Sequence, residues 1–438
     1  MTEKKVSARS TKFFVSFALV VALGGALGLS ADHFYGSSLL FRAPFSAAVS
    51  NATSTPTVPS EEPKVAHLPT PMPLKAVYMT QCVAGTPSFR AELVRLIEDT
   101  ELNAVVIDIK DFSGGLAFPT KNPVLAPYVS TRCGAYDMRE FIETLHRRGI
   151  YVIGRITVFQ DPLYTSFHPE LAVKKLSATT TVWRDYKGLS FIDVGARPFW
   201  DYIVEVGRES YALGFDELNF DYVRYPSDGP MQDVYYPWSG SRSKPEALEE
   251  FFAYLSKELR DRSHYSGQAG PVLSVDLFGM TMTNQNDLNI GQVLERALPY
   301  FDYVYPMVYP SHYPPGFNNW SDPNARPYDI VKHSLSAALV RMAATTTLVA
   351  ALTHERLPAQ AGIGTTTPAL YRKPAYEREM LRPWLQSFDY PVHYTPAMVE
   401  AQIQATYDAG IDSWIFWDPA NRYTSLRQVL LQRATSTP

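Results

Sequence analysis

The sequence predicts a (β/α)8 barrel, preceded by a membrane-spanning segment and a disordered linker. Three observations support this prediction. About 365 residues from Leu74 onward alternate short apolar runs with amphipathic stretches, and this length is ordinary for an α/β barrel with insertions. Eight of the apolar runs resemble strands. No Gly-rich phosphate turn follows the first run, as an open doubly wound sheet would require.

The N-terminal region has the pattern of an export signal. Four basic side chains among residues 1–12 precede an uncharged run over 13–31. This run is longer than the apolar core of a cleavable signal, about 7 to 15 residues, and close to the ~20 that cross a bilayer. We expect a membrane anchor, with a cleaved signal peptide as the alternative. The preceding basic residues place a short cytoplasmic tail, 1–12, inside the cell and the remainder at the cell surface.

Residues 32–73 are expected to form a flexible linker. From Ser46 onward this stretch consists largely of Ser, Thr, Pro, Ala and Val, which bury too little apolar surface to fold. The barrel domain is therefore assigned to residues 74–434.

Composition excludes several classes of function. A net charge of -4, a pI near 6.2 and the lack of a Lys/Arg stripe argue against nucleic acid as a partner. Five of the nine histidines lie in separate segments of the predicted barrel without ligand spacing, namely His146, His168, His312, His354 and His393, so we expect no metal and no cofactor. No Gly-x-Ser-x-Gly turn occurs, which disfavours a serine esterase. All seven Trp lie in the predicted barrel, where they either stack on sugars or fill the core.

Cys82 and Cys133 are the two cysteines of the chain. Outside the membrane they could form a disulfide, but their spacing does not show whether the sulfur atoms meet. The sequence leaves the pairing open.

The predicted elements follow in β–α order. Gly149 and Gly214 end two helices directly before strands. Strands are predicted at 75–79, 103–109, 150–159, 214–226, 272–278, 303–309, 380–387 and 411–417. Helices are predicted at 88–100, 136–148, 197–213, 245–262, 329–343 and 396–409. The pattern breaks down over 345–371, which we expect to be an insertion on a loop.

The fourth strand carries polar residues at alternate positions. Glu217, Asn219 and Asp221 share one face, while Leu218 and Phe220 take the other. Inside a barrel the polar face would point toward an active site. The alternative is an edge strand with a solvated face.

Active sites of such barrels lie at the carboxyl ends of the strands. The polar and aromatic side chains expected there as substrate-binding residues are Asp108, Lys110, Asp111, Arg155, Asn219, Arg224, Tyr305, Tyr309, His312, Trp384, Gln386, Trp417 and Asp418. Aromatic residues in this set either stack on sugars or fill the core.

Asp221 and Asp276 end the fourth and fifth strands and are the candidate catalytic pair. Glycoside hydrolysis needs one ionised carboxylate as nucleophile or base and one protonated acid for the leaving oxygen. A cation from Lys110, Arg155 or Arg224 would keep one group charged. The apolar and Tyr-rich strands nearby would keep the other protonated.

Seven segments carry a resemblance to a known family: KAVYMT, NAVVIDIKD, GRITVFQDP, FDYVRYPSDG, YPMVYPSHY, RPWLQSFDY and DSWIFWDP. In this order they resemble the glycosyl hydrolase barrel family that is described as a domain of unknown function. The resemblance covers nearly everything from Leu74 to the C-terminus. It implies a (β/α)8 fold and a glycosidase activity.

The fourth strand is also similar to α-amylase-type barrels, through Gly214, Asp216 and Asp221. That resemblance implies Asp221 as nucleophile and Asp276 as acid. The sequence departs from the pattern at Asn219, where amylases have Arg, and at Asp276, where they have Glu. Because the acid is shorter, retention and inversion both stay open.

The leading hypothesis is a surface-anchored glycoside hydrolase or transglycosidase that acts on an extracellular or envelope polysaccharide. The alternative is a barrel that binds glycan without cleaving it. Carboxyl groups more than ~12 Å apart would favour binding. A lyase or deacetylase lacks a matching set of residues.

Overall fold

The computed structural model describes residues 65–265, 269–358 and 368–436. The predicted tail, the segment at 13–31 and most of the linker lie outside the described residues. Among those residues, no helix combines the length and apolarity needed to cross a bilayer.

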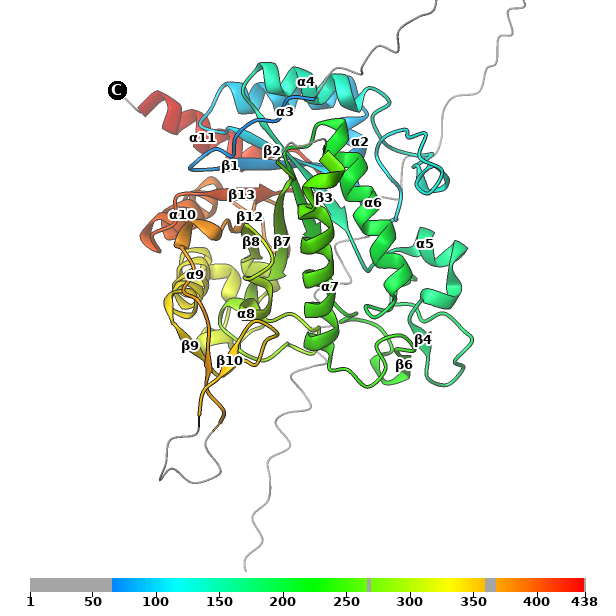
Figure 1. The fold of residues 1–438 in the computed structure, drawn as a ribbon. Coiled ribbons are helices and arrows are strands. Elements are labelled where there is room, and N and C mark those ends of the chain that lie inside the picture. The colour runs from blue at the N-terminus through cyan, green and yellow to red at the C-terminus, as the bar shows by residue number, and fades with distance from the viewer. Residues whose placement is uncertain (1–64, 266–268, 359–367, 437–438) are drawn as a thin grey trace, which may run out of the picture.

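Eight parallel strands close into a barrel, which confirms the predicted fold class (Figure 1). They are β1 (Lys75–Met79), β2 (Ala104–Lys110), β3 (Tyr151–Thr157), β5 (Glu217–Asp221), β7 (Val272–Phe278), β8 (Tyr303–Met307), β12 (Trp384–Gln386) and β13 (Trp414–Trp417). Neighbours around the barrel run β1-β13-β12-β8-β7-β5-β3-β2. Each of the eight predicted strands is present. The seventh is shorter than predicted, because Arg378–Met380 form a 3-10 turn and Pro383 has no N–H for a ladder.

Helices cover the outside of the barrel, as Figure 1 shows. The long ones are α3 (Pro87–Glu98), α4 (Met138–Arg147), α6 (Arg197–Leu213), α7 (Lys244–Arg260), α9 (Pro327–Ala343), α10 (Pro396–Asp408) and α11 (Thr424–Ser436). The short helices are α2 (Gln81–Ala84), α5 (Pro162–Phe167) and α8 (Leu294–Ala297). The six predicted helices are confirmed. A capping box between Ser243 and Glu246 fixes the start of α7.

Two small sheets lie outside the barrel. The predicted insertion contains an antiparallel sheet of β9 (Thr346–Thr347), β11 (Tyr371–Arg372) and β10 (Glu355–Arg356), which projects away from the barrel in Figure 1. A second sheet pairs β4 (Lys174–Lys175) with β6 (Val234–Tyr235). It joins the loop after β3 to the loop after β5, and so fixes the two loops relative to each other.

A buried polar cluster fills the barrel interior around Glu217. This carboxylate accepts hydrogen bonds from Arg382 Nη1 at 3.1 Å, Tyr151 OH at 3.2 Å and Tyr305 OH. The predicted inward-facing polar side of the fourth strand is therefore present. Tyr305 corrects one expectation: it is fully buried and bonded to Glu217, so its ring offers no face to a substrate.

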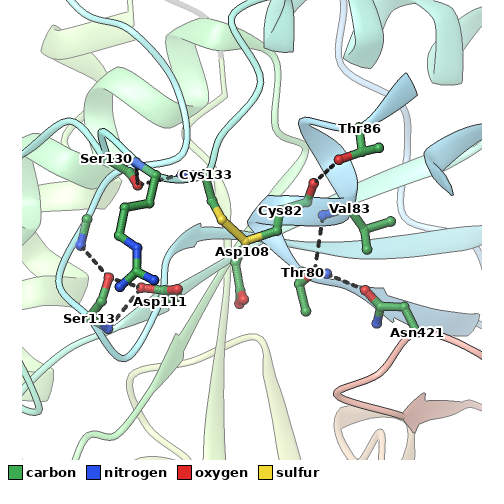
Figure 2. Close-up of a disulfide and its surroundings, with 12 residues drawn as sticks. Thr80, Cys82, Val83, Thr86, Asp108, Asp111, Ser113, Ser130, Cys133 and Asn421 are labelled. Atoms are coloured by element: carbon green, nitrogen blue, oxygen red, sulfur yellow. Dashed lines mark hydrogen bonds between the residues drawn. A yellow bond between two sulfur atoms is a disulfide. The ribbon is translucent and has the colours of Figure 1, made fainter. Parts of the chain in front are cut away.

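A disulfide joins Cys82 in α2 to Cys133 in the loop before α4, which settles the pairing that the sequence left open (Figure 2). The two segments follow β1 and β2 and pack closely, since a Cβ on Gly85 would lie 2.2 Å from the carbonyl oxygen of Gly134. Cys82 follows Met79, the last residue of β1, by three positions, so the bridge lies near the carboxyl end of this strand.

Replacing both cysteines with Ala is expected to lower the free energy of unfolding by about 2 to 4 kcal/mol. The bridge closes a loop across a sequence separation of 51, and its removal increases the conformational entropy of the unfolded chain. Urea unfolding of the unsubstituted chain, with and without reductant, measures the effect of the disulfide. Equal stability in the two conditions would contradict the prediction.

Candidate active site

The carboxyl ends of four neighbouring strands, β2, β3, β5 and β7, place their inward side chains together. Asp108 pairs in register with Arg155, and Arg155 pairs with Asn219. Phe220 of β5 pairs with Val275 of β7, so Asp221 and Asp276 follow at the same level. The two candidate catalytic residues therefore lie on adjacent strands at one rim of the barrel.

Arg155 links three carboxyl groups. Its Nε and Nη2 bond Asp221 Oδ2, with Nε at 3.0 Å. Its Nη1 donates to Asp108 Oδ1 at 2.7 Å, and Nε lies 3.9 Å from Asp276 Oδ2. Because one nitrogen is near both Asp221 and Asp276, their Oδ2 atoms can be no more than about 7 Å apart, the sum of the two distances. This upper limit falls within the range of separations that glycosidases use, about 5 to 9.5 Å.

Asp276 is deeply buried and accepts two hydrogen bonds from uncharged donors. Asn219 Nδ2 and Trp384 Nε1 each donate to Oδ1 at 2.9 Å, and only 1% of the residue is exposed. Burial raises the pKa of Asp276 well above its usual value, and the negative charge of Asp221 raises it further. These effects outweigh the opposite influence of Arg155 and of the two hydrogen bonds, and they favour the protonated form of Asp276.

Asp221 is bound more closely by Arg155 than Asp276 is. Its Oδ2 is paired with the guanidinium of Arg155, and its Oδ1 accepts the backbone N–H of Tyr222. These donors suit a carboxylate. The two neighbouring carboxyl groups thus have the different environments that acid and nucleophile require.

Asp108 is the third carboxyl group of the site. Tyr78 OH donates to its Oδ2, and burial raises the pKa of Asp108 to about 6, with a smaller contribution from Asp111. The ring of Tyr78 stacks on Trp417 at 3.8 Å, and Arg155 lies 4.8 Å from the Trp417 ring. Tyr78 was not among the residues predicted from the sequence, although its position next to the end of the first strand indicates the same rim of the barrel.

The buried Asp108 should make stability fall as the pH rises. Its pKa is higher in the folded chain, about 6, than the ordinary 3.8, so the folded chain binds the proton more tightly. Between about pH 4 and pH 6 the folded chain loses this proton, and the free energy of unfolding should fall by about 2 kcal/mol. Urea unfolding across this range should show a smaller fall in the free energy of unfolding for Asp108→Asn than for the unsubstituted chain. An identical decrease in both proteins would contradict the prediction.

Two expected cations do not pair with the catalytic carboxyl groups. Lys110 is fully buried, pairs with Asp161 at 2.8 Å and lies 5.9 Å from the Phe199 ring of α6. A register shift between Asp108 and Lys110 turns it toward the helix layer, which corrects its assignment to the site. Arg224 donates instead to the Tyr225 carbonyl and the Ser227 hydroxyl.

Three other candidates have structural partners. Gln386 is fully buried and bonds Ser311 N and the carbonyl oxygens of Phe388 and Tyr390. Asp418 accepts the N–H groups of Ala420, Arg422 and Tyr423 and shapes the turn before α11. Trp384 has no exposed surface and bonds Asp276, so it positions the acid rather than stacking on sugar. These placements correct the expectation of direct substrate contact for all three.

The remaining candidates border the site. Tyr309 packs edge-to-face with His312 at 5.2 Å and with Phe388 at 5.5 Å, and the charges of Asp276 and Asp221 act on its phenol. Burial first, and then the charge of Lys187, lower the pKa of His312 to about 4, so its ring is neutral at pH 7. Asp111 is partly exposed and accepts from Ser113. Trp417 is partly exposed beside Arg155.

In the part of the chain that the structure describes, no three His, Cys, Asp or Glu residues are grouped to hold a metal ion.

Comparison with family models identifies the class of this barrel. Residues 76–352 and 365–423 match the family described as "Putative glycosyl hydrolase domain". Because the match covers well over half of the chain, the protein belongs to this family. A search of curated proteins found no match.

Two solved glycosidase structures share the fold. The glycoside hydrolase domain of PgaB (BpsB) from Bordetella bronchiseptica matches with a TM-score of 0.53 and 13% identity, over 82% of this chain and 98% of that domain. The α-L-fucosidase isoenzyme 2 from Paenibacillus thiaminolyticus matches with a TM-score of 0.50 and 12% identity, over 83% of this chain and 49% of the fucosidase. A hypothetical protein from Ruminiclostridium thermocellum is 32% identical over 46% of this chain and 96% of its own, with a TM-score of 0.40.

Proposed function

We propose that this protein is a glycoside hydrolase or transglycosidase that acts on an extracellular or cell-envelope polysaccharide. The observation that carries the proposal is the pair Asp221 and Asp276, linked through Arg155 yet held in different environments. Membership of a glycosyl hydrolase family supports the same reaction class.

Asp276 acts as the general acid. It gives its proton to the glycosidic oxygen as the bond from that oxygen to the anomeric carbon breaks. The hydrogen bonds from Asn219 and Trp384 both end on Oδ1, which leaves Oδ2 to carry the proton.

Asp221 acts on the anomeric carbon. As a nucleophile it forms a glycosyl ester, which water or a sugar hydroxyl then opens; as a base it takes a proton from the attacking water. The limit of about 7 Å between the two Oδ2 atoms includes both geometries. Arg155 holds the Asp221 carboxylate in place and balances its charge.

The alternative is a barrel that binds glycan without cleaving it. The carboxyl separation lies well below the ~12 Å beyond which binding would be favoured. Catalysis is therefore the better-supported proposal. We also propose that residues 13–31 anchor the barrel at the outer cell surface, on the basis of their length and the preceding basic residues.

A glycan screen tests the proposal. The full chain would be incubated with p-nitrophenyl α- and β-glycosides of glucose, galactose, fucose and N-acetylglucosamine, and with hexasaccharides of the same sugars. Mass spectrometry should detect shortened or transferred oligosaccharides. Binding without any cleavage would favour the alternative.

A further inference from the structure

The residue directly after Asp221 has an unusual backbone. Tyr222 has φ of +52°, in the left-handed region, which a bulky residue rarely adopts because its Cβ meets the neighbouring carbonyl. Most other non-glycine residues with positive φ in the described chain are Asn, which tolerates this region. Strained backbone of this kind is concentrated at functional sites.

The left-handed turn changes the direction of the Tyr222 side chain. In a continued strand, Tyr222 would follow Phe220 to the outer face, where Phe220 packs 6.4 Å from Phe301. Instead the left-handed backbone at Tyr222 breaks the strand alternation, and the guanidinium of Arg224 lies 4.9 Å from the Tyr222 ring centre. Tyr222 therefore leaves the strand at the rim, directly after the candidate nucleophile, whose Oδ1 accepts its backbone N–H.

The Tyr222 side chain has a free donor. The guanidinium of Arg224 lies 4.9 Å from the centre of the Tyr222 ring and covers one face of the ring. Within the described residues the hydroxyl makes no hydrogen bond, and the side chain is only partly exposed. Burial raises the pKa of the phenol above its usual value, so the O–H remains a donor at neutral pH.

We propose that Tyr222 is a substrate-positioning residue whose hydroxyl donates a hydrogen bond to a ring hydroxyl of the sugar that Asp221 attacks. Its left-handed backbone and the neighbouring Arg224 place the phenol for this contact. The inference rests on the proposed function and adds a residue that the strand pattern did not predict. The expected ligands are sugars with a free hydroxyl on the carbon next to the anomeric carbon, because hydrogen bonds to that hydroxyl strengthen in the transition state.

Two variants test this role. Tyr222→Phe removes only the hydroxyl and should lower kcat/KM about tenfold on the p-nitrophenyl glycosides and hexasaccharides described above. Tyr222→Gly keeps the backbone conformation, should retain the melting temperature to within about 5 °C, and should lose more activity than Tyr222→Phe. Tyr371→Phe is the matched control, because Tyr371 is also partly exposed but lies in the sheet that projects from the barrel.

Binding separates this inference from hydrolysis itself. The dissociation constants of the hexasaccharides would be measured by calorimetry for Asp221→Asn and for Asp221→Asn/Tyr222→Phe. A rise of about tenfold in the double variant supports the contact, even if the unsubstituted chain cleaves nothing and the proposed hydrolysis fails. Equal dissociation constants, together with unchanged kcat/KM in Tyr222→Phe, would overturn it.

Discussion

Replacing Asp221 with Asn is expected to lower glycan hydrolysis by about 10³-fold or more, with little change in melting temperature. The amide keeps the size of the side chain but can neither attack the anomeric carbon nor accept a proton from water. Initial rates on p-nitrophenyl glycosides and hexasaccharides measure the loss. Asp276→Asn should lose as much on hexasaccharides but less on p-nitrophenyl glycosides, because p-nitrophenolate leaves without an acid.

Asp216→Asn is the matched control for these variants. Asp216 lies just before the opposite end of β5, where its carboxylate accepts the N–H groups of Leu68 and Val152 and bonds His146. This variant should lose stability but keep its activity while folded. Full activity in both Asp221→Asn and Asp276→Asn would remove the catalytic assignment.

Replacing Arg155 with Met should cost about 3 to 5 kcal/mol of unfolding free energy and abolish hydrolysis. The change leaves three buried carboxyl groups, Asp108, Asp221 and Asp276, without their shared cation. Arg155→Lys should not restore activity, because an ammonium cannot bond Asp108 and Asp221 with the same fork geometry. Urea unfolding and initial rates measure the two effects.

Arg382→Met distinguishes a catalytic cation from a structural one. Arg382 is fully buried and pairs with Glu217 inside the barrel, away from Asp221. Its loss should destabilise the chain by a similar amount, while the folded fraction keeps its activity. An active Arg155→Met variant, measured where it is folded, would contradict the assigned role of Arg155.

The sequence predicted the parts of this protein that depend on periodicity. Alternation in the fourth strand placed Asn219 and Asp221 on the inner face, and the order of the strands placed Asp276 beside them. These regularities hold because a closed parallel barrel repeats one strand geometry around its axis.

The missed features depend on local departures from that geometry or on contacts between distant segments. A register shift turned Lys110 outward, and a left-handed residue kept Tyr222 at the rim. The indole of Trp384 meets Asp276 across the barrel interior, which no sequence spacing reveals. The same holds for the bond between Cys82 and Cys133.

The most direct test of the central claim is hydrolysis in H₂¹⁸O, followed by mass spectrometry of the hexasaccharide products. The unsubstituted chain should give shortened products that carry one ¹⁸O at the new reducing end, and Asp221→Asn should give none above background. Products formed equally by both proteins, or glycan binding without any cleavage by the unsubstituted chain, would contradict the account.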